Sequence, residues 1–473
     1  MPHRPTQQDG ASDPRRHLPS VSDLLEQEAV QALVAEHSRP LALDAIHGAL
    51  ERYRKTLTST GAPPDLEAVT ATVVESLRRN EHDRIRPVVN ATGVILHTGL
   101  GRAVLPQRAV DALAWANRCV NLQIDLDTGE RGKRNYMTEQ LLCKLTGAEA
   151  AMVVNNNAGA TLLILAALCE GKEVIVSRGQ LIEIGGSYRL PDCVHQSGAI
   201  LVEVGTTNKT HLRDYERALT ENTGAILRVN PSNYRVIGFS QQVPLADLVT
   251  LKEKQDVLVI DDLGCGALVN LEEHGLPHEP TAPDSIAAGA DLCCFSGDKM
   301  IGGPQAGIIV GREELVSKIR RHPLTRMLRV GKLTDLALEH TLRMFLAPER
   351  LLEEHPTLRM IATPAKDLKR AAQRLKRRID REGLPVDATV AEGESTTGGG
   401  SLPAVPIPTY VVNVAPHNLS AQELAGRLRQ HDTPVIARIR DDQVALDVRT
   451  LMPGDDSIIV AALRACAGRE ERA

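Results

Sequence analysis

The stretch from Asp291 to Gly311 constrains the fold more than any other part of the sequence. A short apolar run leads into a Ser-Gly-Asp-Lys turn, and a glycine-rich loop then leads into a second apolar run. Lys299 stands in the turn, where apolar neighbours before it and glycines after it can desolvate its ammonium group, as Schiff-base chemistry requires. A surface lysine in a hairpin turn is the alternative interpretation. A nucleotide P-loop is disfavoured because G-x-x-x-x-G-K-[ST] is absent from this stretch.

A second motif, AMVVNNNAGATLLILAAL over residues 151–168, has the pattern of a strand that runs straight into a helix. The residues between the two elements are small or polar, so backbone N–H groups are left free at the helix N-terminus. That end of a helix attracts anions, because its N–H groups and its dipole both favour negative charge. An ordinary turn between strand and helix is the alternative. We predict a phosphate site made by Asn156, Asn157, Ala158 and Gly159.

Two acidic residues, Asp261 and Asp262, follow an apolar run about forty positions before Lys299. A pyridoxal phosphate (PLP) enzyme needs a carboxylate against the pyridine nitrogen of the cofactor. We predict Asp261 for this role because it directly follows the apolar run, although the sequence leaves the choice between the two open. Ser296 lies three residues before Lys299, a spacing by which PLP enzymes often bring a hydroxyl to the cofactor phosphate. A metal site is disfavoured, since no histidine or further carboxylate stands at ligand spacing.

The pattern of the chain changes along its length and predicts four parts. Residues 1–20 carry four prolines among polar neighbours and are predicted to be disordered. Three helical patterns come before anything resembling a strand, which predicts a separate helical domain over residues 21–86. Apolar runs alternate with helical segments over residues 87–347, as in a large α/β domain with a mostly parallel sheet. Residues 348–473 are predicted to form a small α+β domain.

Within the C-terminal part, the pattern predicts a long basic helix between Lys366 and Arg381. It also predicts a hairpin across Asp441 and Asp442, because two extended stretches flank this pair. A solvent-exposed face is the favoured interpretation of the basic helix, with contact to an RNA backbone as the alternative.

The composition excludes some classes of function. At 473 residues and 42% hydrophobic content, the chain can bury a sizeable core. Aromatic residues make up 2%, so stacking platforms for single-stranded nucleic acid are scarce, and a net charge of −5 argues against indiscriminate binding of polyanions. The eight cysteines show neither C-x-x-C nor metal-ligand spacing, and no signal peptide or membrane-length apolar run is evident. We expect a soluble cytoplasmic protein with reduced cysteines and no metal.

Arginines at two places are candidates for binding an anion. In NATGVILHTGLGRAVLP, glycine turns flank His97 and present Arg102, whose forked donors suit a phosphate or carboxylate. Arg326 and Arg329 stand three residues apart in a helical pattern and are expected to project from one helix face. A solvated loop and a solvated helix face are the alternatives.

The sequence places the phosphate cradle first, then the acid that would pair with the pyridine nitrogen, and then Ser-x-x-Lys and the glycine turn. This order resembles that of fold-type-I PLP enzymes. The strings NATGVILHTGLGRA, RGQLIEIGGSYRLPD, VGTTNKTH, DDLGCGAL, FSGDKMIGGPQAG and GGGSLP resemble the bacterial selenocysteine synthase family, the L-seryl-tRNA(Sec) selenium transferases. The resemblance covers nearly the whole chain from about residue 20. Gly99 stands where an asparagine is expected, and the first twenty residues match nothing.

The resemblance implies a fold-type-I PLP-dependent transferase in which Lys299 forms the internal aldimine. It implies that seryl-tRNA(Sec) becomes selenocysteinyl-tRNA(Sec) by loss of the serine hydroxyl to a dehydroalanyl intermediate, followed by addition of selenium from selenophosphate. Arg102, Arg326 and Arg329 would bind selenophosphate. The N-terminal helical domain would hold the tRNA, and dimers would assemble into a ring-shaped decamer.

The residues fit this chemistry on their own terms. A seryl group esterified to tRNA has a free α-amine but no free carboxylate, so an arginine that clamps a carboxylate is unnecessary. Few acids apart from Asp298 lie near Lys299 in sequence, which leaves the Lys299 amine as the natural base for the α-proton. We predict both residues to be catalytic.

Two other hypotheses stay open. A PLP lyase that acts on a small phosphorylated amino or sugar acid would have the same core, but it gives the N-terminal helices no task. A PLP-fold protein that serves only as a binding module is disfavoured by the intact Lys299, Asp261 and phosphate cradle.

Overall fold

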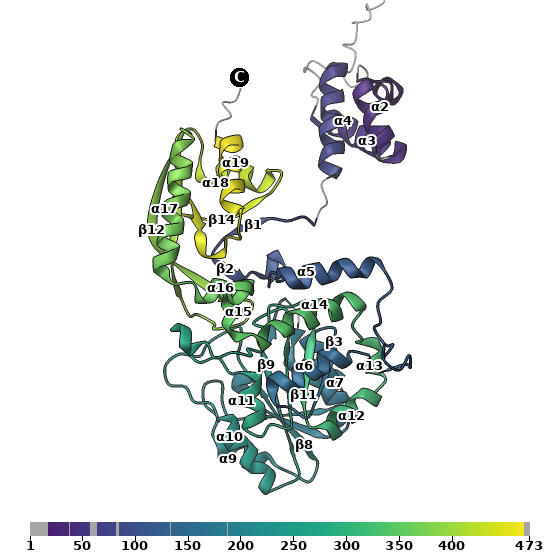
Figure 1. The fold of residues 1–473 in the computed structure, drawn as a ribbon, viewed down its shortest axis with the longest axis vertical. Helices are drawn as coiled ribbons and strands as arrows, with labels where there is room; N and C mark the ends of the chain where they lie inside the picture. The colour runs from purple at the N-terminus through teal and green to yellow at the C-terminus, as the bar shows by residue number, and fades with distance from the viewer. Residues whose placement is uncertain are drawn as a thin grey trace, which may run out of the picture. The chain divides into compact units, whose positions relative to one another are not determined.

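The computed structural model describes residues 18–36, 38–56, 64–81, 85–132, 134–186 and 188–467. The chain divides into two compact units, residues 1–87 and 88–473, and each has its own hydrophobic core (Figure 1). Most of the tail that the sequence predicts to be disordered, residues 1–20, lies outside the described residues.

The described residues of the N-terminal unit form four helices where the sequence predicts three: α1 (Val21–Leu25), α2 (Glu28–Glu36), α3 (Arg39–Thr56) and α4 (Leu66–Glu81). The first predicted helix is interrupted because the side chain of Gln27 donates to the carbonyl of Asp23 at 3.1 Å, while its backbone N–H turns to Leu24. A continuous helix would use the Asp23 carbonyl for the backbone N–H of Gln27. The helices pack on a small apolar core: Leu24, Val30, Ile46, Leu50, Val69 and Val73.

A seven-stranded sheet forms the centre of the second unit, in the order β3-β11-β10-β9-β8-β4-β7. Its strand β11 runs antiparallel to both neighbours, and the other pairs are parallel. The strands are β3 (Ala150–Val154), β4 (Glu173–Ser177), β7 (Ile200–Val204), β8 (Thr223–Val229), β9 (Leu258–Gly264), β10 (Leu292–Ser296) and β11 (Gly307–Gly311). This sheet confirms the predicted α/β fold with a mostly parallel sheet.

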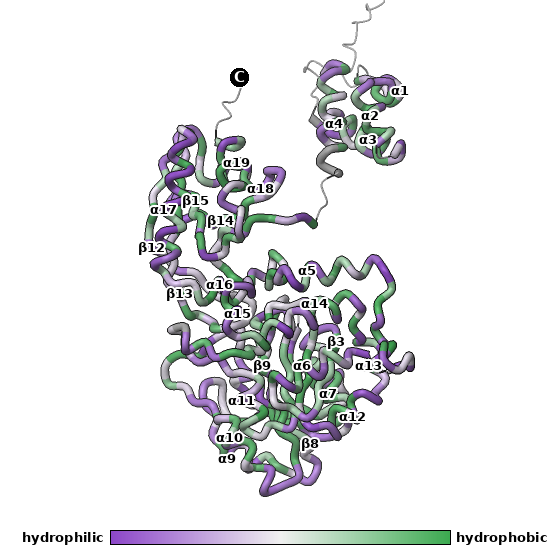
Figure 2. Tube along the Cα trace, in the orientation of Figure 1, coloured by the Kyte–Doolittle hydropathy of each residue, from purple (hydrophilic) through white to green (hydrophobic). Residues whose placement is uncertain are grey.

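Helices cover the sheet on both faces, so most of its strands are buried, and apolar residues concentrate around β8 and β11 (Figure 2). Among them, α7 is apolar on nearly all sides because it packs between the sheet and the helices α8 and α12. The covering helices are α5 (Gln107–Leu113), α6 (Tyr136–Thr146), α7 (Asn157–Leu168), α8 (Leu190–Gln196), α9 (Leu212–Ala218), α10 (Leu245–Val249), α11 (Ala282–Ala287), α12 (Glu313–Arg321), α13 (Leu324–Met327), α14 (Lys332–Leu342), α15 (Pro348–Glu354) and α16 (Pro356–Ala362).

A second sheet of six strands, in the order β1-β14-β15-β13-β12-β2, forms the C-terminal part. Four strands come from the end of the chain: β12 (Val386–Gly398), β13 (Ile407–Pro416), β14 (Val435–Arg440) and β15 (Gln443–Asp447). The helices α17 (Ala365–Arg381), α18 (Ala421–Gln430) and α19 (Asp455–Ala467) pack on this sheet around their own apolar core. The predicted hairpin is confirmed, since β14 and β15 are antiparallel and both Asp441 and Asp442 have positive φ angles.

The two outer strands of this sheet come from the start of the unit. Strand β1 (Val89–Ala91) pairs with β14, and β2 (Val94–Leu96) pairs with β12, both in parallel. The segment predicted as the large domain, residues 87–347, therefore begins with two strands that belong to the C-terminal sheet. A side chain from the end of the chain holds them, because the Thr450 hydroxyl donates to the Asn90 carbonyl at 2.7 Å and accepts from the Gly93 N–H at 3.1 Å.

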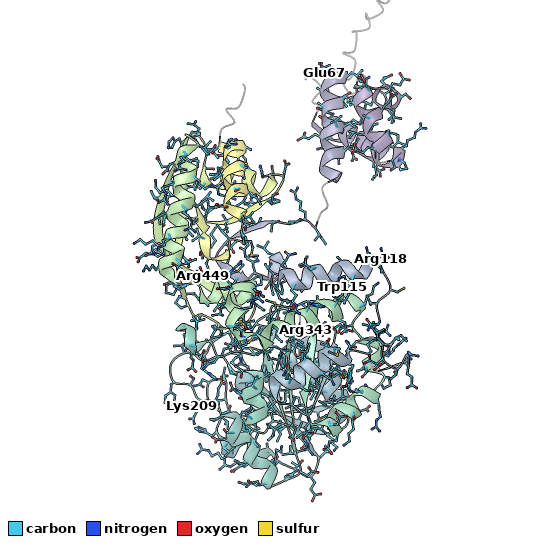
Figure 3. The ribbon with its side chains drawn as sticks, viewed as in Figure 1. Glu67, Trp115, Arg118, Lys209, Arg343 and Arg449 are labelled. Carbon is cyan, nitrogen blue, oxygen red and sulfur yellow. The ribbon has the colours of Figure 1, made fainter. Side chains whose placement is uncertain are left out.

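The buried Arg449, labelled in Figure 3, ties the C-terminal sheet to the chain that enters it. Its guanidinium donates to the carbonyl of Pro408 at 2.7 Å and to that of Thr363 at 3.2 Å, as well as to Met360. Backbone carbonyls from two segments thus converge on one rigid cation, which fixes α16 against the start of β13.

None of the helices within the described ranges is long and apolar enough to cross a membrane.

Candidate active site

The turn that carries Lys299 is fixed by three backbone hydrogen bonds between the ends of β10 and β11. Gly297 donates to Ala306, Gly302 to Lys299 and Gly303 to Gly297, each at 2.9 Å. Gly302 has φ +67°, a conformation that glycine adopts without strain. The turn leaves Lys299 half-buried rather than on the open surface.

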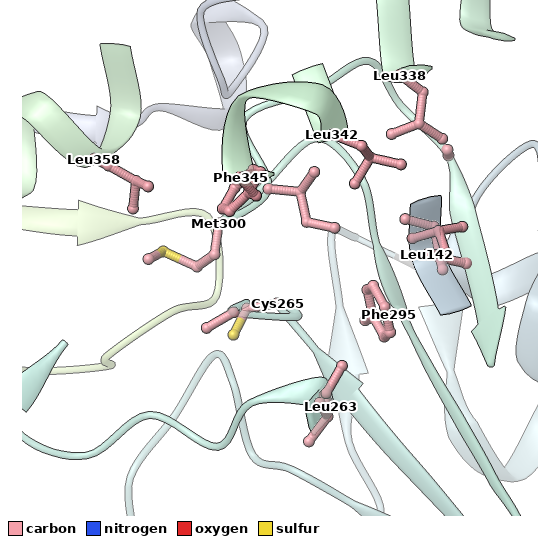
Figure 4. Close-up of a cluster of buried hydrophobic side chains, with 14 of the residues drawn as sticks. Leu142, Leu263, Cys265, Phe295, Met300, Leu338, Leu342, Phe345 and Leu358 are labelled. Carbon is pink, nitrogen blue, oxygen red and sulfur yellow. The ribbon is translucent and has the colours of Figure 1, made fainter. Parts of the chain in front are cut away.

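An apolar cluster underlies this turn (Figure 4). Phe295 and Met300, on either side of the turn, are buried, and Leu338 and Leu342 of α14 belong to the same cluster. The packed side chains leave the Lys299 backbone little freedom to move.

His355 supports the turn from the side of α16. Its Nε2–H donates to the Ile301 carbonyl at 2.8 Å, and its Nδ1 accepts the N–H of Leu358 at 3.2 Å, so the ring is held neutral. A side chain at Gly302 would collide with it, since a Cβ there would lie 2.1 Å from the His355 ring. Burial lowers the pKa of His355 to about 4, against the two backbone hydrogen bonds.

The predicted phosphate cradle lies at the same sheet edge as the lysine turn. Across β11, Gly307 pairs with Ser296 on one side and Val154 on the other, so β3 and β10 end next to each other. A Cβ at Gly307 would lie 2.1 Å from the carbonyl oxygen of Asn156, so glycine is required for this close approach. The N-terminus of α7 is thereby placed beside the end of β10.

One residue of the predicted cradle has a different role. Asn156 caps α7, and its side chain accepts the N–H of Gly159 at 2.8 Å. That N–H is therefore already satisfied, and it is not free to meet a phosphate as the sequence suggested. Asn157 and Ala158 remain as the donors of the first turn, whose N–H groups have no partner within a helix.

Asp262 faces the cradle. Its carboxylate accepts from the Asn157 side chain at 2.8 Å, from the Thr161 hydroxyl at 3.0 Å and from the Gly264 N–H at 3.0 Å. Burial raises the pKa of Asp262, while the hydrogen bonds from Asn157 and Thr161 and the charge of Lys299 oppose that rise. A buried carboxylate within reach of the lysine charge is the group that a pyridine nitrogen would meet.

Asp261 points the other way, because successive side chains of a strand face opposite sides of the sheet. It accepts from Arg228 and from the Ser285 hydroxyl, both at 2.6 Å, and it is fully buried. Both carboxylate oxygens are engaged by these partners. The geometry thus contradicts the preference for Asp261 and favours Asp262.

Arg102 is held beside Lys299 by the neighbouring acid. The guanidinium donates to Oδ2 of Asp298 at 2.7 Å, and the N–H of Ala103 donates to the Asp298 carbonyl at 3.3 Å. Arg102 has φ +63°, which is strained for a residue with a side chain and persists where surrounding contacts enforce it. The buried Asp298 thus neutralises and positions Arg102, and its predicted catalytic role stays a prediction.

Arg326 and Arg329 do not share a helix face as predicted. The helix α13 ends at Met327, because the carbonyl of Leu328 turns to accept the N–H of Asn155 at 2.9 Å, and Arg329 then forms a bridge with Val154. The charges of Arg134 and Arg326 lower the pKa of Arg329, the effect of Arg134 being the larger. The three guanidinium groups therefore gather next to the start of α7.

Arg134 was missed by sequence reasoning. It stands in the string GERGKRNY, where its neighbours are also charged. Nothing in this local sequence distinguishes it from an arginine in a solvent-exposed loop. A contact nearly two hundred positions along the chain, from its guanidinium to the carbonyl of Val330 at 3.4 Å, brings it to the other two arginines.

Two further groups line the lysine. A Cβ at Gly400 would lie 3.4 Å from Lys299 Nζ and 3.2 Å from Ser232 Oγ, so this glycine leaves space directly beside the amine. Among the described residues, Ser232 Oγ and Asn157 Oδ1 are buried polar atoms without a hydrogen-bond partner. Buried polar groups are nearly always paired, so unpaired ones around an open space indicate a ligand site.

The donor set fits PLP. Lys299 supplies an amine, Asp262 a buried carboxylate and α7 a helix N-terminus, and the unpaired atoms of Ser232 and Asn157 remain for further hydrogen bonds. These are the groups that a carbonyl, a pyridine nitrogen and a phosphate require.

Comparison with known proteins agrees with this site. Residues 88–452 match the family described as L-seryl-tRNA selenium transferase, and residues 15–54 match the family described as selenocysteine synthase N terminal. This chain belongs to the L-seryl-tRNA selenium transferase family.

Individual relatives extend the match over almost the whole chain. The L-seryl-tRNA(Sec) selenium transferase of Nitratidesulfovibrio vulgaris is 47% identical over 96% of this chain and 99% of its own length. The proteins of the same name from Geobacter sulfurreducens and from Clostridium botulinum strain Okra are 45% and 44% identical, and they cover 95% and 94% of this chain.

A solved structure of D-glucosaminate-6-phosphate ammonia-lyase has the same fold, with a TM-score of 0.56 over 81% of this chain and 96% of its own. At 21% identity, that likeness concerns the fold alone. This chain therefore has the predicted fold-type-I architecture, and its cofactor is PLP.

The two aspartates of β9 can be separated by substitution. We expect Asp262→Asn to weaken PLP binding and to reduce turnover on the order of a hundredfold, because a neutral amide cannot keep the pyridine nitrogen protonated. Asp261→Asn should keep the visible absorption of lysine-bound PLP but lose about 3 kcal/mol of stability, because Arg228 loses its charged partner. Absorption spectra and thermal unfolding of both variants measure this. The reverse pattern would return the nitrogen-partner role to Asp261.

The buried His355 should make stability depend on pH. Its pKa in the folded chain is about 4, below the unfolded value of 6.5, so the unfolded chain binds the extra proton between these values. Stability is then lost as the pH falls from 6.5 to 4, by about 3 kcal/mol.

Replacing His355 with glutamine should abolish this part of the pH dependence, whatever its effect at neutral pH. His195→Gln is the matched control, because the side chain of His195 is exposed and its replacement should leave the pH dependence unchanged. The free energy of unfolding, measured by chemical unfolding at several pH values, tests this. An equal dependence of that free energy on pH in His355→Gln and in the parent chain would contradict it.

Proposed function

We propose that this chain converts L-seryl-tRNA(Sec) into L-selenocysteinyl-tRNA(Sec) with selenophosphate as the selenium donor. The observation that carries the proposal is the half-buried Lys299 within range of the Asp262 charge, in a chain whose relatives bear the name of that transferase at 44–47% identity.

Particular residues would hold PLP in this site. Lys299 Nζ would bind its carbonyl carbon, Asp262 would keep its pyridine nitrogen protonated, and the N–H groups of Asn157 and Ala158 would face its phosphate. The hydroxyl of Ser296, at the end of β10, is at the same sheet edge for a further phosphate contact. Bound there, PLP supplies an electron sink for the seryl α-carbon.

The chain's own groups then move the protons. The freed amine of Lys299 takes the α-proton of the seryl group, since Asp298 is engaged by Arg102 and Asp262 is buried against the cradle. The serine hydroxyl leaves as water with the proton that Lys299 took. Selenium from selenophosphate then bonds to the same carbon, a proton returns to the α-carbon, and water cleaves the P–Se bond to release phosphate. Lys299 is therefore both the point of attachment and the base.

The arginines would hold the selenium donor. Selenophosphate is a small, highly charged anion, and forked guanidinium donors match its oxygens. Arg326 and Arg329, together with Arg134, form a concentrated positive charge at the start of α7. Arg102 is held against the lysine turn by Asp298. Like charges held together are costly, and a bound anion would offset that cost.

The N-terminal unit would hold the tRNA, and copies of the chain would assemble. Helix α3 carries basic residues in its last turn, and residues 15–54 match a family segment of this enzyme class. On the second unit, Trp115, Leu126 and Met327 are large apolar side chains left more than half exposed, as expected where a second copy docks. We propose that dimers assemble into a ring-shaped decamer in the cytoplasm, where charged tRNA is used.

A lyase acting on a small phosphorylated amino or sugar acid is the second candidate. The ammonia-lyase fold is shared, but the sequence agrees far better with the transferases, and a small substrate leaves the N-terminal unit without a task.

The decisive experiment supplies labelled seryl-tRNA(Sec), selenophosphate and the PLP-loaded protein. We expect labelled selenocysteinyl-tRNA(Sec), with little product from ordinary seryl-tRNA(Ser) and none from a Lys299→Ala variant, which should also lack the visible absorption. Equal turnover of both tRNAs, or activity only on phosphorylated small acids, would refute the proposal.

The two halves of the reaction should separate at the arginines. Arg326→Ala or Arg329→Ala removes a charge-assisted contact to the donor and should raise the selenophosphate needed about ten- to a hundredfold. Release of the serine hydroxyl should stay near its normal rate, because that step needs no donor. Arg321→Ala, an exposed arginine of α12, is the matched control. Single-turnover assays that stall before hydroxyl release would move the donor site to Arg102.

Removing the N-terminal unit, residues 1–87, should leave a folded, PLP-loaded second unit, because the two units have separate cores. We expect the truncated protein to lose most of its affinity for tRNA(Sec). Binding measured by gel shift tests this, and unchanged affinity would assign recognition to the basic helix α17.

A further inference from the structure

A glycine-rich loop in an unusual conformation follows β12. Gly398, Gly399 and Gly400 all have positive φ angles, and so does Leu402, at +45°. The left-handed region is unfavourable for leucine, which has a Cβ, and Leu402 is nevertheless buried there. Such a conformation persists only where neighbouring groups hold it.

The loop is packed between β2 and Lys299. A Cβ at Gly398 would lie 2.5 Å from Val94 Cγ1, and one at Gly399 would lie 2.7 Å from Leu96 Cβ. On its other side, Gly400 faces the Lys299 amine, where a Cβ would lie 3.4 Å from Nζ. The loop thus covers one side of the lysine, and it has no room for side chains at Gly398 and Gly399.

A buried acid from the large sheet region holds this loop. Glu279 is 4% exposed, and its Oε2 accepts the backbone N–H of Leu402 at 3.2 Å. Its Oε1 accepts the thiol of Cys265 at 2.7 Å, directly beyond the β9 strand that carries Asp262. One carboxylate therefore joins the strained residue of the loop to the strand of the cofactor site.

The groups around Glu279 support its role as the acceptor of two hydrogen bonds. Burial raises its pKa, and Cys265, the Leu402 N–H, His278 and Lys299 all act in the opposite direction. Burial raises the pKa of the Cys265 thiol far above its usual value, so the thiol keeps its proton and donates it. The carboxylate thus lies within range of the Lys299 charge, and its two hydrogen bonds connect the Cys265 thiol to the loop.

We propose that Glu279 is a positioning residue, which holds the loop Gly398–Leu402 over Lys299 and so limits the access of water and small nucleophiles to the bound cofactor. The proposal rests on the proposed function, since it concerns the same lysine. It assigns Glu279 no proton transfer and no contact with substrate.

Two variants separate holding the loop from merely filling space. Glu279→Gln keeps a carbonyl oxygen that can accept from Leu402, whereas Glu279→Ala removes the acceptor. Glu139→Ala is the matched control, because Glu139 is also a buried glutamate of the same unit, paired with Arg320 at 2.7 Å. It should lower stability without affecting the loop.

The direct measurement is amide hydrogen exchange of the PLP-loaded protein in the peptide that contains Leu402. We expect exchange there to be about tenfold faster in Glu279→Ala, because one hydrogen bond to a charged acceptor is lost. Glu279→Gln should recover most of the protection, and the Glu139→Ala control should match the parent at this peptide.

The second measurement is the rate at which hydroxylamine removes the visible absorption of lysine-bound PLP. We expect this rate to rise about tenfold in Glu279→Ala and to stay near the parent rate in Glu279→Gln and Glu139→Ala. Unchanged loop protection in Glu279→Ala, or equal effects of the alanine and glutamine variants, would overturn the inference. Neither measurement uses selenium transfer, so a parent protein that is inactive on seryl-tRNA(Sec) would refute only the proposed function.

Discussion

The close approach between β11 and the start of α7 is the constraint on which the site depends. At Gly307 the carbonyl of Asn156 lies where any side chain would be, so the antiparallel strand can run directly beneath the helix N-terminus. The same strand returns from the Lys299 turn, and it therefore fixes the distance between the lysine and the phosphate cradle. A lysine and a helix N-terminus from segments nearly 140 positions apart become parts of one site through a single glycine.

Features encoded by short segments could be predicted from the sequence. The lysine turn, the strand that runs into α7 and the hairpin at Asp441 depend on local apolar patterns and on turn residues, and the structure shows all three. The choice between Asp261 and Asp262 could not be made this way, because the face on which each lies is decided by α7 on one side and by Arg228 and Ser285 on the other. The group of three arginines could not be predicted for a similar reason, since a distant loop supplies Arg134.

The site also depends on the C-terminal sheet, although its cofactor groups lie on the large one. The loop after β12 reaches Lys299, and Glu279 and Arg449 join the two regions through backbone groups of Leu402, Thr363 and Pro408. Each is a charged side chain buried against backbone atoms, an arrangement that holds position closely because breaking these contacts would leave a buried charge poorly paired. Movement of the C-terminal sheet would therefore shift the groups that surround Lys299.

The pairing of β1 with β14 has a consequence for how the chain is made. Val89 leaves the ribosome long before its partner Val435, which is synthesised about 350 residues later. At about 5–20 residues per second, the first strand waits roughly 20 to 70 s for its neighbour. For most of this time the apolar edge at residues 89–96 is uncovered, and the loop over Lys299 does not yet exist. The nascent protein can thus fold its central sheet first, and it gains a closed cofactor site only after residues 398–402 have been made.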